Sequence, residues 1–166
     1  VVEDLPGSKI DGVCAWLDAR SPVIALSLRY GRVDSFWHTL FHELGHLTAG
    51  DGLKEPPPLD VDLDKHISGL PDVEQAATRF AVETLIPPAQ MDSFIARIGP
   101  AYSLKNINNF ADRIGVHPAI VIGQLAHPDR NEILWSRFGK TFRSIRDYVT
   151  SSALTDGWGH ILPAMN

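Results

Sequence analysis

Two runs of residues near the start of the chain alternate between apolar side chains and polar or small ones. Residues 10–17 form the first run and residues 23–30 the second, with turn-forming residues 18–22 between them. The apolar members of the second run that would share one face of a strand are Ile24, Leu26 and Leu28. This pattern predicts a β-hairpin.

Apolar positions then change to helical spacing over residues 36–49. The apolar side chains that recur every three or four residues are Phe36, Leu40, Leu44 and Leu47. Asp34 or Ser35 is placed to cap the start of this helix, and Gly50 to end it in a left-handed conformation. Gly45 costs about 1 kcal/mol of helix propensity relative to alanine. We therefore expect another backbone to approach it closely.

Residues 50–71 show no periodicity. Three prolines at 56–58 favour an extended polyproline segment, and the surrounding acidic residues predict a solvated lid or connector. Pro71 then opens a second helix over residues 72–85. A carboxylate followed by small side chains falls on one stripe of this helix, at Glu74, Ala77, Thr78 and Ala81. Such a stripe suits close packing against the first helix.

Three more helices are predicted at residues 89–98, 104–114 and 118–126, the second of them capped by Ser103. The last two have the outline of a helix-turn-helix. As a DNA reader the final helix is poorly equipped, because it offers only Gln124 for base edges and no Arg or Lys for phosphate. We predict an αα-hairpin that packs on the core.

Residues 135–149 are predicted to form one amphipathic, basic helix that docks on the domain or on a partner. Its apolar residues are Trp135, Phe138, Phe142, Ile145 and Val149. We expect a core at residues 1–102 and a helical C-terminal region at residues 103–166 packed on it. Residues 150–166 carry no pattern that predicts a structure.

Composition and charge narrow the class of protein. The net charge of −5 argues against a general affinity for nucleic acid or anionic lipid, and no apolar run approaches the length of a membrane span. The single cysteine, Cys14, excludes an internal disulfide and is predicted to fill the core, so we expect a cytoplasmic location. Because the chain begins at Val1 and not at Met, we expect it to be a fragment.

The clearest chemical pattern lies in the first predicted helix. His42 and His46 are four residues apart, which places both imidazoles on one face of a helix, where they suit a tetrahedral Zn²⁺. Glu43 sits about 100° further round the helix, close enough to reach a water molecule on the metal without ligating it. This HExxH pattern supplies two ligands and a general base.

The spacing of residues does not decide which side chain is the third zinc ligand. A catalytic zinc usually takes three protein ligands, and Glu74, Asp72 and the acidic loop at residues 51–72 compete for that place. A carboxylate at Glu74 is equally well explained as a first-turn acid that complements the helix dipole. A donor for the oxyanion is also needed. The candidates for this donor or for substrate contact are Tyr30, His66 and Arg79.

Two motifs in combination resemble the ImmA/IrrE family of zinc metallopeptidases. They are Phe-His-Glu-Leu-Gly-His-Leu at residues 41–47 and the Glu-x-x-Ala segment that starts at residue 74. The segment at residues 110–118 is also similar, and the resemblance extends over roughly residues 10–127. The zinc ligands that it implies are His42, His46 and Glu74. It also implies that Glu43 is catalytic.

The resemblance implies an α+β, zincin-like fold with a small, mostly antiparallel sheet and a helical C-terminal part. Members of this family act on helix-turn-helix repressors, and some are fused to a DNA-binding domain, which is plausible before Val1 here. We therefore predict a zinc metallo-endopeptidase that hydrolyses a peptide bond in such a repressor. The acidic loop and the basic C-terminal helix depart from the family pattern and leave the choice of substrate open.

Two other functions remain as hypotheses. The chain would serve as a non-catalytic, zinc-stabilised, protein-binding domain of a transcriptional regulator if His66 or an acid from residues 60–64 closed the metal site. Direct DNA binding by residues 103–127 would show a steep dependence on salt. Strand addition of a peptide to the hairpin and a purely structural hairpin are equally good interpretations of residues 10–30.

Overall fold

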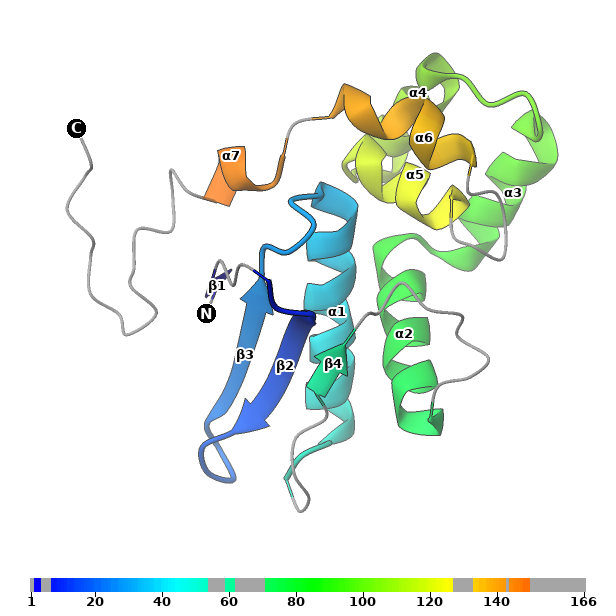
Figure 1. Cartoon of the computed structure of the whole chain (residues 1–166). Helices are drawn as coiled ribbons and strands as arrows, with labels where there is room; N and C mark the ends of the chain where they lie inside the picture. The colour runs from blue at the N-terminus through cyan, green and yellow to red at the C-terminus, as the bar shows by residue number, and fades with distance from the viewer. Residues whose placement is uncertain are drawn as a thin grey trace.

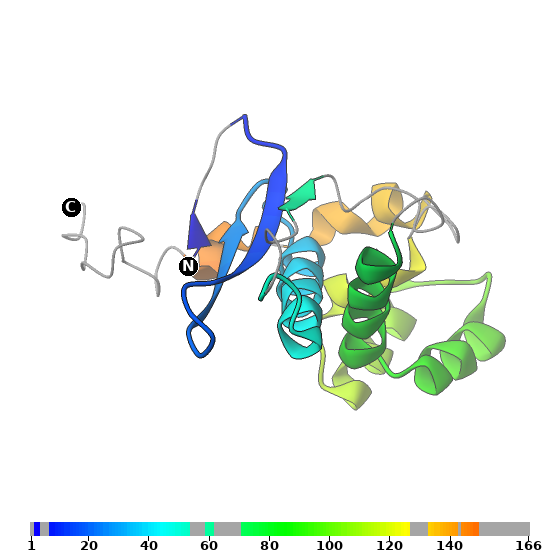
Figure 2. The same cartoon turned by 90° about the horizontal axis from the view of Figure 1, so that it is seen from below.

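The computed structural model describes residues 2–3, 7–53, 59–61, 71–126, 133–142 and 144–149. A small sheet lies against one side of a long helix, a second long helix lies on another side, and shorter helices gather at one end (Figures 1 and 2). The predicted α+β class with a zincin-like arrangement is confirmed.

The sheet has four strands in the order β1-β3-β2-β4. They are β1 (Val2–Glu3), β2 (Ile10–Trp16), β3 (Pro22–Ser27) and β4 (Leu59–Val61). Strand β2 pairs antiparallel with both β3 and β4, whereas β1 pairs parallel with β3. The predicted hairpin is confirmed, but its second strand is shorter than expected, because a turn closed by Gly31 N–H and the Leu28 carbonyl follows β3.

Helix α1 (Val33–Ala49) packs on the sheet and begins earlier than predicted. Its N-cap residue is Arg32, and no side chain caps it. The predicted caps Asp34 and Ser35 were wrong because both lie inside the first turn, where the Asp34 carboxylate forms an ion pair with Arg32. The predicted end is confirmed, since Gly50 adopts a left-handed conformation with φ of 76°.

Helix α2 (Asp72–Leu85) lies beside α1 (Figures 1 and 2). The two helices approach each other tightly at Gly45, where an added Cβ would lie 3.0 Å from the Cα of Ala77. The expectation that a backbone approaches Gly45 is therefore confirmed. This contact fixes the spacing between the two helices.

Helices α3 (Pro88–Ile98), α4 (Leu104–Ile114) and α5 (Pro118–Leu125) complete the main apolar core. The Ser103 hydroxyl accepts the Asn106 N–H at 3.3 Å, as predicted for a cap. Helix α5 is largely buried, and the Gln124 amide donates to the Val82 carbonyl at 3.0 Å. The helical pair is thus a core hairpin, as expected. The division of the chain at residue 102 stays a prediction.

The predicted helix over residues 135–149 is wrong. The chain forms α6 (Ile133–Phe138), a 3₁₀ turn η2 (Gly139–Thr141) and a short α7 (Arg146–Val149). The break lets the segment return to the start of α1, where Ser144 Oγ and Ile145 N–H both donate to the Gly31 carbonyl at 2.9 Å. Within the described part of the chain, no helix has the length and apolar character needed to cross a membrane.

Candidate metal centre

Two helices bring His42, His46 and Glu74 together. The histidines lie one turn apart on α1, and Glu74 lies in the first turn of α2. The Nε2 atoms of the two histidines are 3.0 Å apart, and Oε2 of Glu74 lies 3.1 Å from that of His42 and 3.5 Å from that of His46. Three potential ligand atoms therefore converge on one point.

Each histidine is held through its other ring nitrogen. Nδ1 of His46 lies 2.9 Å from Oδ2 of Asp51, and Nδ1 of His42 lies 3.2 Å from Oγ1 of Thr78. Asp51 is itself fixed, because its carbonyl accepts the Trp16 indole N–H at 2.8 Å. If each Nδ1–H donates to its oxygen partner, both Nε2 atoms present lone pairs toward the cluster.

This donor set fits a zinc ion. Two imidazole lone pairs and a carboxylate oxygen in close contact repel one another unless a proton or a cation lies between them. Tetrahedral zinc with bonds of about 2.0–2.2 Å separates its ligand atoms by about 3.3–3.6 Å. The three distances, 3.0, 3.1 and 3.5 Å, are near that range. The side chains thus need only small shifts to hold the metal.

The electrostatics of the cluster favour positive charge. Burial opposes protonation of His46, but hydrogen bonds with Glu74 and Asp51 outweigh it and raise the pKa of His46 above its usual value. Both histidines have no exposed surface. A cluster that attracts a proton in this way also attracts a divalent cation, and the two compete for the same nitrogen.

Glu43 shares this buried region. Its side chain is fully buried, and its carboxylate lies directly beneath Gly12 of β2, where an added Cβ would collide with Oε1. Thr39, one turn earlier on α1, is also buried and faces the same glycine. The predicted general base is therefore enclosed between α1 and the sheet.

The buried side of α1 is polar. Thr39, His42, Glu43 and His46 are at most 5% exposed. By contrast, the leucines whose spacing predicts the helix are only partly buried, at Leu40, Leu44 and Leu47. A helix that buries charged and polar groups in preference to leucines requires a compensating role for them.

Glu74, and not Asp72, joins the cluster. Asp72 is exposed at the first position of α2, and Arg79 is exposed further along it. Tyr30 lies before the start of α1, whereas His42 is about 13 Å along the helix from its first residue. His66 and the acids at 62–64 lie outside the described residues. The roles suggested for Tyr30, His66 and Arg79 stay predictions.

Sequence reasoning missed both residues that hold the histidines. The sequence pattern indicates Thr78 only as a small residue on the stripe of α2, although it lies four residues after Glu74 and so shares its face. The same pattern places Asp51 only in the acidic loop. Its position directly after the helix-ending Gly50 was the available signal.

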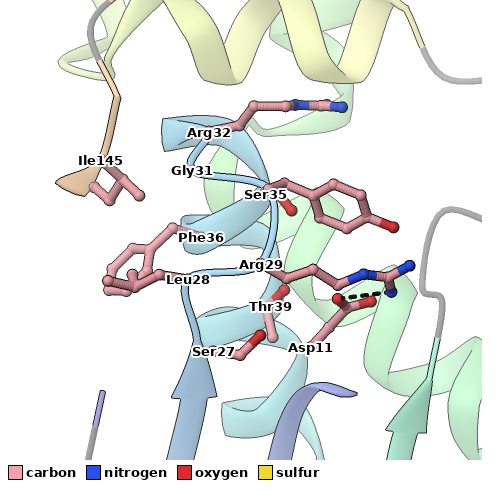
Figure 3. Close-up of a pocket in the computed structure, with 11 residues that line it drawn as sticks. Asp11, Ser27, Leu28, Arg29, Gly31, Arg32, Ser35, Phe36, Thr39 and Ile145 are labelled. Atoms are coloured by element: carbon pink, nitrogen blue, oxygen red, sulfur yellow. Dashed lines mark hydrogen bonds and ion pairs between the residues drawn. The ribbon is translucent and has the colours of Figure 1, made fainter. Parts of the chain in front are cut away.

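A small pocket lies on the sheet side of α1, between its start and the adjoining ends of β2 and β3 (Figure 3). Asp11, only 4% exposed, forms an ion pair with Arg29 at 3.3 Å. The Arg29 guanidinium also lies 4.7 Å from the centre of the Tyr30 ring. Thr39 lines the pocket one helical turn before Glu43. The pocket therefore ends one helical turn before Glu43, which does not itself line it.

The comparison with known families agrees with this geometry. The sequence profile of peptidase family M78, described as the IrrE N-terminal-like domain, matches residues 1–125. No curated protein matches the chain. The matched span contains the sheet, the paired helices with the His–His–Glu cluster, and the helices through α5. It ends before the C-terminal turns that return to α1. With most of its length matched and the cluster assembled, the chain belongs to the IrrE N-terminal-like peptidase family.

Proposed function

We propose that this protein is a zinc-dependent endopeptidase in which His42, His46 and Glu74 hold the metal and Glu43 acts as the general base. The observation that carries the proposal is the convergence of three donor atoms within 3.5 Å, two of them on fully buried histidines, with Nδ1 of each histidine engaged elsewhere. Family membership supports a peptidase. Zinc is the metal that two imidazoles and a carboxylate commonly bind in such sites.

The reaction is addition of water across a peptide bond. When bound, zinc supplies Lewis acidity that acidifies a water molecule and polarises the scissile carbonyl. Glu43 then accepts a proton from the attacking water and delivers it to the nitrogen of the leaving amine. Asp51 and Thr78 keep the imidazoles oriented, and the burial of Glu43 and both histidines excludes bulk water from the proton transfer.

The sheet offers a place for an extended substrate. Strand β4 is at one end of the strand order, so it has a partner strand, β2, on one side only among the described strands. An extended peptide that pairs with such an edge gains backbone hydrogen bonds without sequence specificity. We propose that the substrate is a regulatory protein, such as a helix-turn-helix repressor. This choice rests on the family resemblance alone.

The test combines metal analysis with a conservative variant. Glu43→Gln keeps the size of the side chain but removes its basicity. We expect one zinc per chain in both proteins, and a fall in kcat of about 10²- to 10⁴-fold in the variant. Cleavage is followed by mass spectrometry of the new termini in a panel of helix-turn-helix repressors. Equal turnover by the two proteins would refute the assignment of Glu43 and with it the proposed mechanism.

The non-catalytic alternative makes a different prediction about coordination. It requires a fourth protein ligand. Of the residues suggested for that role, His66 and the acids at 62–64 lie outside the described residues. X-ray absorption spectroscopy of the zinc-loaded protein counts the nitrogen and oxygen ligands. An exchangeable ligand that added chloride or cyanide displaces favours the peptidase, whereas four protein ligands favour the binding domain.

A further inference from the structure

Gly12 has no room for a side chain because the carboxylate of Glu43 occupies that space. A Cβ built on Gly12 would collide with Oε1 of Glu43 and would lie 2.7 Å from Cγ2 of Thr39. The backbone conformation does not require glycine at residue 12, since the φ angle of Gly12 is not positive. The restriction at this position is therefore one of space, set by the end of the Glu43 side chain.

Neither the strand nor the helix can easily retreat from this contact. Gly12 is paired with Leu26 of β3 on one side and with Asp60 of β4 on the other, so β2 is fixed in the middle of the sheet. The pairing with β4 shifts register between Ile10 and Gly12. Such irregularities in a ladder re-aim the residues around them. Helix α1 is held in turn by its packing on the sheet and on α2.

We propose that Gly12 is a positioning residue for Glu43: the space left by the missing side chain at Gly12 holds the Glu43 carboxylate and fixes its direction. This inference rests on the proposed function, because the direction of the carboxylate matters only if Glu43 is the general base. A general base works only within about 2.6–3.2 Å of the proton that it takes. A side chain at residue 12 would displace the Glu43 carboxylate from this space without contacting the proposed zinc ligands.

The contact itself is tested by a cycle of variants that needs no substrate. Because the Thr39 methyl also faces Gly12, Thr39→Ser serves as the common background and keeps the hydroxyl. In that background Gly12→Ala should lower the melting temperature of the zinc-loaded full chain by at least about 4 °C when residue 43 is Glu. When Glu43→Ala is also present, Gly12→Ala should cause no such decrease. Equal decreases in both backgrounds would overturn the proposal.

Metal content and kinetics test the positioning role. The Gly12→Ala, Thr39→Ser protein should still bind one zinc per chain, and its kcat should be at least tenfold below that of Thr39→Ser with KM within twofold. Unchanged kcat, or loss of zinc, would show that Gly12 serves packing alone. The stability cycle is independent of the Glu43→Gln experiment: that experiment can fail while the stability cycle succeeds, and the reverse also holds.

Discussion

Asp51 and His46 are joined twice. The Asp51 N–H donates to the His46 carbonyl at 3.0 Å, and the Asp51 carboxylate lies 2.9 Å from Nδ1 of the His46 ring. Both contacts depend on the left-handed turn at Gly50, which folds the chain back over the last turn of α1. The signal that ends the helix thus also places a carboxylate behind a metal-binding imidazole.

This arrangement predicts the effect of Asp51→Asn. The amide oxygen still accepts a hydrogen bond from Nδ1, but the negative charge that makes the imidazole a better ligand is lost. We expect zinc affinity to fall by about 10- to 100-fold, measured by competition with a chelator. Asp18→Asn, which removes an exposed carboxylate on the hairpin, is the matched control and should bind zinc as the wild type does. Wild-type affinity in Asp51→Asn would contradict the role.

Thr78 should support stability and zinc binding through its hydroxyl group and not through the volume of its side chain. It is 5% exposed, and Thr78→Val keeps its volume while leaving Nδ1 of His42 without this oxygen. An unsatisfied buried group costs about 1–3 kcal/mol, so both the free energy of unfolding and zinc affinity should decrease. Thr78→Ser should restore both. Equal loss in the Ser and Val variants would show that packing, not the hydrogen bond, is responsible.

Gly45 sets the distance between the two helices that carry the cluster. Because the atom nearest an added Cβ belongs to the backbone of Ala77, it cannot rotate away. Gly45→Ala should destabilise the fold by about 1–3 kcal/mol and weaken zinc binding by moving Glu74 away from the histidines. Glu83→Ala, on the exposed side of α2, is the control. Unfolding by urea and chelator competition measure the two effects, and zinc affinity equal to wild type would exclude the spacing argument.

The sequence predicts the elements of this fold better than it predicts their contacts. The helical spacing of apolar residues predicts α1, and proline and glycine predict where the neighbouring helices begin and end. Each of these signals lies within a short stretch of sequence. The spacing did not reveal which face is buried: Leu40 and Leu44 carry the periodicity, yet His42 and Glu43 lie deeper. Burial of a polar face depends on contacts with α2 and β2, which are distant in sequence.

The same reason explains the missed parts of the site. The residues alone leave Glu74 and Asp72 in competition, and the family resemblance implies Glu74. The orientation of α2 beside α1 brings Glu74, and not Asp72, to the histidines. The break after Phe138 also depends on a distant contact, the Gly31 carbonyl that binds Ser144 and Ile145. An apolar repeat over residues 135–149 is compatible with one helix or with two short ones. The contact of this segment with the Gly31 carbonyl decides between the two arrangements.

His117 predicts a pH dependence that is separate from the metal. Its Nδ1 accepts the Ala119 N–H at 3.1 Å and so caps α5, which requires the neutral ring. Burial lowers the pKa of His117 below its usual 6.5, although Asp34 opposes the shift. The unfolded chain therefore takes up a proton before the folded one does, and stability present above about pH 6.5 is lost as the pH falls through the lowered pKa.

Asparagine at this position tests the assignment, because it caps a helix without titrating. The difference in the free energy of unfolding between wild type and His117→Asn should be constant above about pH 6.5 and should shift in favour of the variant at lower pH. Urea unfolding between about pH 5 and 8 measures it, and taking the difference cancels the titration of the zinc ligands that both proteins share. Parallel curves throughout would mean that His117 does not titrate differently in the folded protein.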